Sequence, residues 1–219
     1  MIPHKLLKTL LITSLLSTSL FAVFNYNISN IDKQVAMRMI KGNSWREGCP
    51  VSLSNLRYVQ VNHWDFNNRT VSGEIIVHKD IADELVAIFE ELYAIGYPIR
   101  QMHLISNYNG NDWKSIDADN TSAFNCRPVT GKKRKWSKHA YGRAIDLNPI
   151  ENPYISRSGH ISHKASLKYR ERKHHLNSYA DKAILLKYDQ ATKIFKKYGW
   201  SWGGDWHTMK DYQHFVKKN

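Results

Sequence analysis

The sequence lacks low-complexity runs and internal repeats, and beyond its first residues it lacks long hydrophobic runs. Aromatic residues make up 12% of its 219 residues. This composition excludes a largely disordered chain and indicates a folded globular protein. The length suits one domain with a sizeable core.

Cysteine is scarce, since Cys49 and Cys126 are the only two in the chain. The chain can therefore form at most one internal disulfide. Both residues lie in polar, loop-like contexts, REGCPV and FNCRPV, which favours a disulfide in an exported protein. The alternative is a pair of free, buried thiols.

Acidic residues are also few. The chain has 19 of them against 32 lysines and arginines, which gives a formal charge of +13. Such a surface favours anionic partners. For an exported protein we expect these to be anionic polymers of the cell envelope. Charge alone would also suit nucleic acid, but no nucleic-acid-binding motif is present, so we expect no such partner.

The N-terminus has the features of an export signal. MIPHKLLK carries two lysines and no acid, and the apolar stretch 9–24 is shorter than the roughly 20 residues of a membrane-spanning helix. We expect residues 1–22 to be a signal peptide and the protein to be exported, either to the periplasm or to the extracellular side or cell wall. There is no cysteine near position 22, so we do not expect a lipoprotein. After cleavage no membrane span remains, whereas an uncleaved segment would anchor the protein in the membrane.

The hydrophobic patterns predict a mixed order of strands and helices, which is typical of an α+β fold. Strands are expected at 56–64 and 70–78 as a hairpin, at 101–106, at 143–148 and twice near the C-terminus. Helices are expected at 31–42, ended by Gly42, in the segment after 79, ended by Gly96, and at 181–199. Residues 107–138 are expected to be a long loop, and loops of this length are usually functional or disordered.

Three parts are predicted along the chain. Residues 1–22 form the signal peptide, residues 23–47 a linker with a short helix, and residues 48–219 the main domain. Within that domain, the basic segment 154–180 is expected to be a surface insertion, because it shows little apolar periodicity.

The segment WSKHAYGRAIDLNP places His139 and Asp146 seven positions apart. A catalytic zinc site takes three ligands from histidine, carboxylate or cysteine and keeps a fourth position for water. Extended, the chain between the two residues would span about 23 Å, so it must fold back to bring both to one ion. Gly142 permits that turn. By themselves, His139 and Asp146 are weak evidence for a metal site, because this spacing is common by chance.

A third ligand is available in DYQHF, which contains His214 and, three residues earlier, Asp211. A zinc hydrolase also needs a general base near the attacking water, and Asp211 suits that role. His207 and Asp205 compete for the third ligand position. An ordinary packed histidine at a strand is the alternative for His214.

Together, SKHAYGRAID and GWSWGGDWHTMKDYQHF resemble the M15 zinc peptidases, a family of D-alanyl-D-alanine carboxypeptidases and L-alanyl-D-glutamate endopeptidases. The resemblance covers roughly residues 48–219 and is weakest across 154–180. The stretch 120–131 resembles the family segment that carries a substrate-facing arginine. The matching positions are Ser137, His139, Gly142, Ala144, Asp146, Asp211 and His214, with the arginine at Arg127.

The resemblance implies a small mixed or antiparallel sheet with flanking helices, similar to hedgehog domains and D-Ala-D-Ala peptidases. It implies one zinc ion per chain, bound by His139, Asp146 and His214. Asp211 would be the general base, and Arg127 would bind substrate or neutralise the oxyanion.

Ser137 would contribute a hydrogen bond to the substrate in such an enzyme. The implied activity is hydrolysis of peptidoglycan stem peptides by a monomer, with either family bond as the target. The alternative is a non-catalytic, zinc-containing binding module of the cell envelope. Asp211 argues against that alternative, because a binding module needs no base beside the metal.

Overall fold

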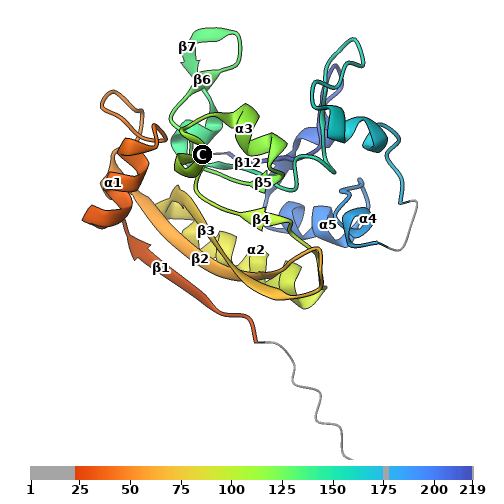
Figure 1. Ribbon diagram of the computed structural model, residues 1–219, viewed down its shortest axis with the longest axis horizontal. Helices are drawn as coiled ribbons and strands as arrows, with labels where there is room; N and C mark the ends of the chain where they lie inside the picture. Colours follow the sequence, from red (N-terminus) through yellow and green to blue (C-terminus); the bar gives the residue numbers. More distant parts are fainter. Residues whose placement is uncertain (1–22, 175–177, 219) are drawn as a thin grey trace, which may run out of the picture.

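The computed structural model describes residues 23–174 and 178–218 (Figure 1). The predicted signal peptide at 1–22 lies outside the described residues. None of the helices in the described part of the chain combines the length and apolar character needed to cross a membrane.

The first sheet is antiparallel and has the strand order β1-β2-β3. Its strands are β1 (Tyr26–Asn30), β2 (Leu56–Trp64) and β3 (Thr70–His78). β2 and β3 pair from Leu56 opposite His78 to Trp64 opposite Thr70, and the turn between them contains Asn68 in the left-handed region. This confirms the predicted hairpin with its bounds.

Two helices flank this sheet (Figure 1). α1 (Lys33–Lys41) begins at Asp32, whose side chain accepts a hydrogen bond from the Val35 amide at 2.8 Å, and it ends at Gly42. α2 (Ala82–Ala94) packs an apolar face on the sheet. A 3-10 turn, η2 (Lys79–Ile81), precedes it, and Gly96 follows it with a left-handed backbone. Both predicted helices are confirmed.

The second sheet has the strand order β10-β12-β8 and is also antiparallel. Its strands are β8 (Ala144–Asp146), β10 (Trp200–Trp202) and β12 (His214–Lys217). Together with the first sheet and the helices, it confirms the predicted α+β class with small antiparallel sheets.

The remaining elements are short. Two-stranded pairs are formed by β9 (Tyr154–Ile155) with β11 (Lys210–Asp211), by β4 (Gln101–Met102) with β5 (Asn120–Thr121), and by β6 (Pro128–Val129) with β7 (Lys132–Trp136). The other helices are α3 (Asp112–Asp117), α4 (Tyr179–Lys182) and α5 (Gln190–Lys197). The other 3-10 turns are η1 (Leu53–Asn55), η3 (Ile105–Tyr108), η4 (Lys138–Tyr141), η5 (Lys164–Tyr169) and η6 (Gly203–Asp205).

The main core lies between the two sheets, α2 and α5. Phe89 from α2, Phe195 from α5 and Phe215 from β12 are among its largest fully buried side chains. The rings of Phe195 and Phe215 stack with their centroids 4.0 Å apart. Burial of aromatic side chains of this size supplies much of the hydrophobic stabilisation that joins the sheets.

The single helix predicted at 181–199 is wrong, because the chain is helical only in α4 and α5. Between them the backbone bonds to side chains elsewhere in the protein. The Ala183 carbonyl accepts hydrogen bonds from Tyr97 at 2.7 Å and Asn152 at 2.9 Å, and the Leu185 amide donates to Asn152 at 2.7 Å. These partners replace the bonds that a continuous helix would make.

Two further predictions were wrong in extent. The strand expected at 101–106 is limited to β4, and η3 follows it. The long loop expected at 107–138 contains α3 and the short strands β5, β6 and β7. The lengths of these elements, two to six residues, are too short to produce a detectable hydrophobic period.

Arg172 anchors the basic segment 154–180 to the core. Its guanidinium donates to the Asn152 side chain at 2.8 Å, the Leu185 carbonyl at 3.0 Å and the Glu151 carbonyl at 2.6 Å. A half-buried cation thus helps to hold the segment, while most of its other described basic residues face solvent.

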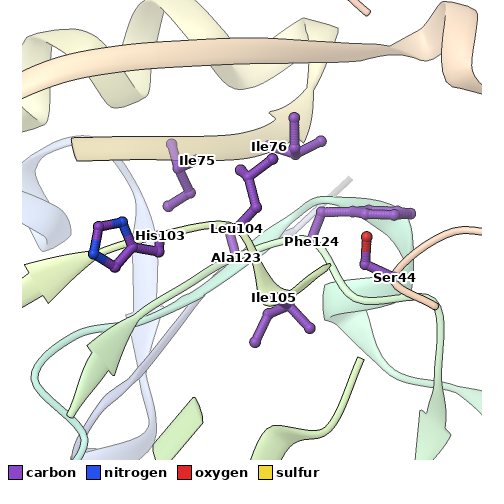
Figure 2. A pocket seen from close by; sticks show the side chains of 8 residues that line it. All are labelled: Ser44, Ile75, Ile76, His103, Leu104, Ile105, Ala123 and Phe124. Atoms are coloured by element: carbon purple, nitrogen blue, oxygen red, sulfur yellow. The ribbon is translucent and has the colours of Figure 1, made fainter. Parts of the chain in front are cut away.

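A small cavity lies beside the inner face of β3 (Figure 2). Its wall is mainly apolar, with Ser44 and His103 as its polar members. The other lining residues are Ile75, Ile76, Leu104, Ile105, Ala123 and Phe124. None of the predicted metal ligands belongs to this wall.

A disulfide joins Cys49 to Cys126, with their Cα atoms 5.8 Å apart and 77 positions between them in sequence. It ties the loop that follows α1 to the segment before β6. Arg46 supports the same contact, because its guanidinium donates to the Cys126 carbonyl at 2.7 Å.

We expect Cys49→Ala/Cys126→Ala to lower the free energy of unfolding by about 2–5 kcal/mol, because a cross-link over a long loop restricts the unfolded chain. Urea denaturation of the double variant and of the unmodified protein, with and without reductant, measures this. Equal stability in all samples would contradict the expectation.

Glu151, in the segment that follows β8, forms a buried carboxyl pair with Asp119. They are 1% and 6% exposed. Tyr169 donates to Glu151 at 3.1 Å, and the Ile150 amide donates to Asp119 at 3.0 Å. Burial raises the pKa of both carboxyls, and the charge of Asp119 raises the pKa of Glu151 further. The pair therefore retains a proton at a pH at which exposed carboxyls have lost theirs.

The folded chain then binds more protons than the unfolded chain above the usual glutamate pKa, so stability falls as the pH rises. We expect Glu151→Gln to flatten this loss between about pH 5 and pH 8, since an amide cannot release the proton. Urea denaturation across this range provides the measurement. The exposed Glu90→Gln on α2 is the control and should keep the original slope. Parallel slopes for both variants and the unmodified protein would refute the assignment.

Candidate metal centre

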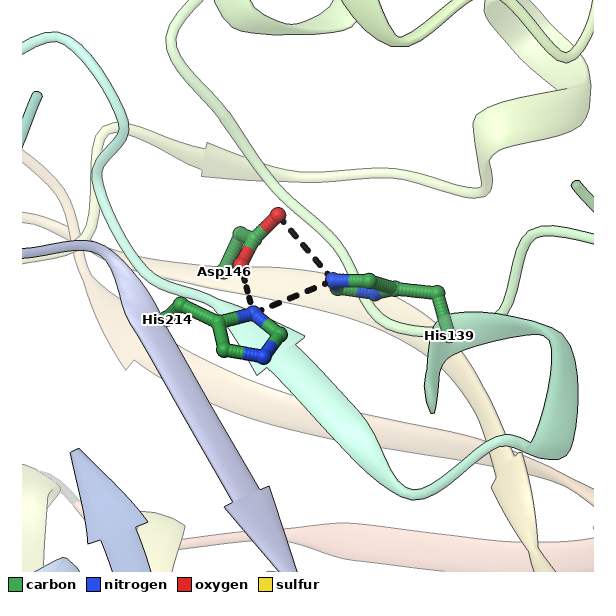
Figure 3. A group of neighbouring side chains, drawn as sticks. All are labelled: His139, Asp146 and His214. Atoms are coloured by element: carbon green, nitrogen blue, oxygen red, sulfur yellow. Dashed lines mark hydrogen bonds and ion pairs between the residues drawn. The ribbon is translucent and has the colours of Figure 1, made fainter. Parts of the chain in front are cut away.

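His139, Asp146 and His214 come together in one cluster (Figure 3). His139 Nε2 lies 3.2 Å from Asp146 Oδ2, and His214 Nδ1 lies 2.9 Å from Asp146 Oδ1. The two histidine nitrogens, His139 Nε2 and His214 Nδ1, are 3.3 Å apart. Among the described residues, these three form the one group of histidine, cysteine or carboxylate side chains that could hold a metal ion.

The turn η4 presents His139. Ser137 begins it, and the Ser137 hydroxyl accepts a hydrogen bond from the His139 amide at 3.3 Å. Gly142 ends it with φ of 65°, and a Cβ there would lie 2.6 Å from the His78 backbone nitrogen. Both the backbone conformation and the space require glycine. The predicted fold-back at Gly142 is confirmed.

The pairing of β8 with β12 presents the other two residues. Asp146 lies directly opposite His214 in the antiparallel register. On the other side of Asp146, its backbone exchanges hydrogen bonds with Ser122 at 2.8 and 3.0 Å. Asp146 is thus held from both sides, and directly opposed residues of an antiparallel pair have adjacent side chains.

The Ala123 carbonyl orients the His139 ring. His139 Nδ1 lies 2.6 Å from this oxygen, which can only accept a hydrogen bond. Nδ1 therefore carries the proton, and Nε2 presents its lone pair to the cluster. A backbone carbonyl on the remote nitrogen is the usual support of a metal-binding histidine.

The electrostatics of the cluster keep Asp146 ionised. Burial alone would raise its pKa, but His139 and His214 offset this and hold the pKa of Asp146 well below its usual value. Burial alone would lower the pKa of His214, but the hydrogen bond and the charge of Asp146 raise it. The carboxylate is thus available as an anionic ligand.

Asp211 lies beside the cluster on β11, opposite Tyr154 of β9. Burial raises the pKa of Asp211 to about 6, with His214 acting against this shift and Asp146 adding to it. Gln213 donates to Asp211 Oδ1 at 3.2 Å. A carboxyl with a raised pKa next to a potential metal site suits acid–base chemistry.

The other predicted site residues are distributed around the cluster. Arg127 is close enough for its charge to lower the pKa of His214, and it forms an ion pair with Asp112 at the start of α3. Ser137 is nearly buried, and its hydroxyl caps the His139 turn. The Ser137 hydroxyl therefore already has a hydrogen-bond partner within the protein, the His139 amide.

The competing candidates lie outside the cluster. Asp205 pairs with Lys196 at 2.7 Å, and the His207 side chain is exposed. The ring of Trp206, which lies between them in sequence, is 5.7 Å from the His214 ring. This segment therefore places an aromatic wall beside the cluster instead of a third ligand.

Sequence reasoning missed three participants, namely the Ala123 carbonyl, Asp112 and Asn125. The Asn125 side chain donates to Asp112 at 2.7 Å, and its backbone amide donates to the His139 carbonyl at 3.3 Å. All three lie in the segment 107–138, whose length was the one signal that pointed to function.

The donor set fits a divalent transition metal. Two imidazole nitrogens and one carboxylate are the ligand types of catalytic zinc sites. Tetrahedral ligands at about 2.0–2.1 Å from zinc lie about 3.3–3.4 Å from each other. The observed separations of 2.9, 3.2 and 3.3 Å are near this spacing. Three protein donors also leave a position for another ligand.

We expect the purified protein to bind one divalent ion per chain, and we expect His214→Ala to weaken binding at least roughly 100-fold, because it removes a donor. Calorimetric titration of chelator-treated protein with Zn²⁺ measures both. His207→Ala, in the same segment but exposed, should bind like the unmodified protein. Equal losses in the two variants would exclude this cluster as the binding site.

Comparison with known proteins identifies the second half of the chain. The family model described as D-alanyl-D-alanine carboxypeptidase, of the M15 peptidases, matches residues 130–217. No curated protein sequence and no solved structure matches the chain. The matched segment contains His139, Asp146, Asp211 and His214, whereas Arg127 precedes it. This match supports the M15 peptidase family that the motifs predicted.

Proposed function

We propose that this protein is an exported zinc peptidase that hydrolyses a peptide bond in peptidoglycan stem peptides. The observation that carries the proposal is the His139–Asp146–His214 cluster with a carboxyl of raised pKa, Asp211, beside it. The M15 family match supports the peptidase class. The Cys49–Cys126 disulfide supports export, because disulfides persist in oxidising compartments.

In this proposal His139, Asp146 and His214 hold the zinc ion. Zinc in such a site supplies Lewis acidity to the scissile carbonyl and to water. The Ala123 carbonyl keeps His139 in the tautomer that binds a metal through Nε2. The paired strands β8 and β12 keep Asp146 and His214 opposed without rearrangement.

Asp211 is the proposed proton carrier. Its carboxylate accepts a proton from the attacking water and delivers that proton to the nitrogen of the departing amine as the C–N bond breaks. The pKa of about 6 leaves the group mostly ionised near neutrality and still able to donate. Arg127 is proposed to neutralise negative charge that develops on the carbonyl oxygen, or to bind the substrate, since guanidinium stays charged at any relevant pH.

Two bonds are candidates. A carboxypeptidase removes a terminal D-alanine and needs a cation for the free carboxylate, while an endopeptidase cuts between L-alanine and D-glutamate and needs an open groove. The matched family model has the carboxypeptidase description. Mass spectrometry of purified muropeptides after incubation with the protein, with and without chelator, separates them. Chelator-sensitive loss of one alanine indicates the carboxypeptidase, and a new peptide beginning with D-glutamate indicates the endopeptidase.

We expect Asp211→Asn to retain zinc and to lower the cleavage rate roughly 10²- to 10⁴-fold, because the amide keeps the shape but cannot accept a proton from water. His139→Ala should lose both zinc and cleavage. Metal content by elemental mass spectrometry and rates on muropeptides are the two readouts. Asp205→Asn is the matched control, since it removes the same charge from an exposed residue in the segment before β11.

An Asp211→Asn protein that cleaves at the normal rate would overturn the mechanism. An unmodified protein that binds zinc and cleaves no muropeptide would overturn the peptidase assignment in favour of a binding module.

A further inference from the structure

The ion pair between Arg127 and Asp112 joins two segments that meet at the candidate metal centre. Arg127 Nε contacts Asp112 Oδ2, and the two side chains are 28% and 29% exposed. The pair is therefore accessible but partly enclosed. Among the described residues, Asp112 is the acidic partner of Arg127.

Asp112 is itself held in place. Its second oxygen, Oδ1, accepts a hydrogen bond from Asn125 Nδ2 at 2.7 Å, and the same nitrogen donates to the Gly110 carbonyl at 3.1 Å. Asn125 is 2% exposed, so it has no freedom to follow a moving partner. The Asp112 carboxylate thus accepts a hydrogen bond from the Asn125 side chain at one oxygen and pairs with Arg127 at the other.

The backbone around Arg127 is anchored to the metal centre. The Arg127 amide donates to the Asn125 carbonyl at 2.9 Å, and the Ser137 amide donates to the Arg127 carbonyl at 3.1 Å. The Asn125 amide reaches the His139 carbonyl at 3.3 Å. Only the arginine side chain would be free to sample rotamers, and the contact with Asp112 restricts it.

The remaining nitrogens of the guanidinium are available. Nη1 makes one long hydrogen bond of 3.3 Å to the Pro128 carbonyl, and within the described part of the chain Nη2 has no hydrogen-bond partner. A free arginine side chain loses rotamer freedom when it is fixed. A prior ion pair at Nε removes much of that loss before a substrate arrives.

We propose that Asp112 is a positioning residue, which fixes the side-chain conformation of Arg127 beside the His139–Asp146–His214 cluster; the inference rests on the function proposed above. Asp112 acts through Arg127 and does not contact the reacting atoms. It therefore contributes only while Arg127 is present, and a double-variant cycle tests this dependence directly.

The experiment compares muropeptide cleavage by the unmodified protein, Asp112→Ala, Arg127→Ala and the double variant. We expect Asp112→Ala to lower kcat/KM roughly 10- to 100-fold. We also expect it to change the same parameter, kcat or KM, that Arg127→Ala changes. In the Arg127→Ala background, removal of Asp112 should have no further effect. Asp112→Asn retains one acceptor oxygen and should fall between Asp112→Ala and the unmodified protein.

Asp117→Ala is the matched control. It removes the same charge from the same helix, α3, but its carboxylate is 55% exposed and pairs with His163. We expect unchanged kinetics. Zinc content and circular dichroism of each variant exclude loss of the metal or of the fold as the cause.

A second readout does not depend on activity. In ¹⁵N NMR of the zinc-loaded protein, the Arg127 Nε–H should exchange slowly with water, and Asp112→Ala should make the exchange fast. Rapid exchange in the unmodified protein, a loss below twofold in Asp112→Ala, or additive losses in the double variant would each overturn the inference and leave the proposed function intact. Absence of cleavage by the unmodified protein would overturn the proposed function, and the positioning role with it.

Discussion

The antiparallel pairing of β8 with β12 is the constraint on which the rest of the molecule depends. It sets Asp146 opposite His214 at the surface of the cluster, while the next residue, Phe215, enters the core and stacks on Phe195. Because side chains alternate along a strand, a slip of one residue would exchange the histidine and the phenylalanine. The register that buries the aromatic core is therefore the same register that assembles the candidate metal centre.

Buried polar groups hold the loops around this pair of strands. Asn152 bonds to the backbone between α4 and α5, and Arg172 bonds to Asn152 and to the Glu151 carbonyl. Tyr212, next to Asp211, packs against the Arg172 guanidinium at 4.3 Å. Buried polar groups are costly unless paired, so such a network is specific to one arrangement. It connects the basic segment 154–180 with the segment that carries the proposed base.

Local patterns predicted the elements that are long or clearly capped. The hairpin 56–64/70–78 was predicted with its bounds because both strands are rich in β-branched residues and Asn68 lies in the turn between them. The bounds of α1 are set by Asp32 and Gly42. The helix expected at 181–199 was wrong because Asn152 and Tyr97 compete for its backbone. Such tertiary hydrogen bonds leave no periodic trace in the sequence, and they outweigh a modest helical propensity.

The sequence by itself determined the candidate ligand set: two histidines, two carboxylates and a glycine at spacings that resemble those of the M15 family, which the match to residues 130–217 supports. Those spacings are informative because each ligand depends on its own short segment, a turn or a strand. Only the tertiary structure decided which groups support them. The Ala123 carbonyl contacts His139, and Asp112 contacts Arg127. These contacts join segments without local periodicity, so only the packing of the whole chain specifies them.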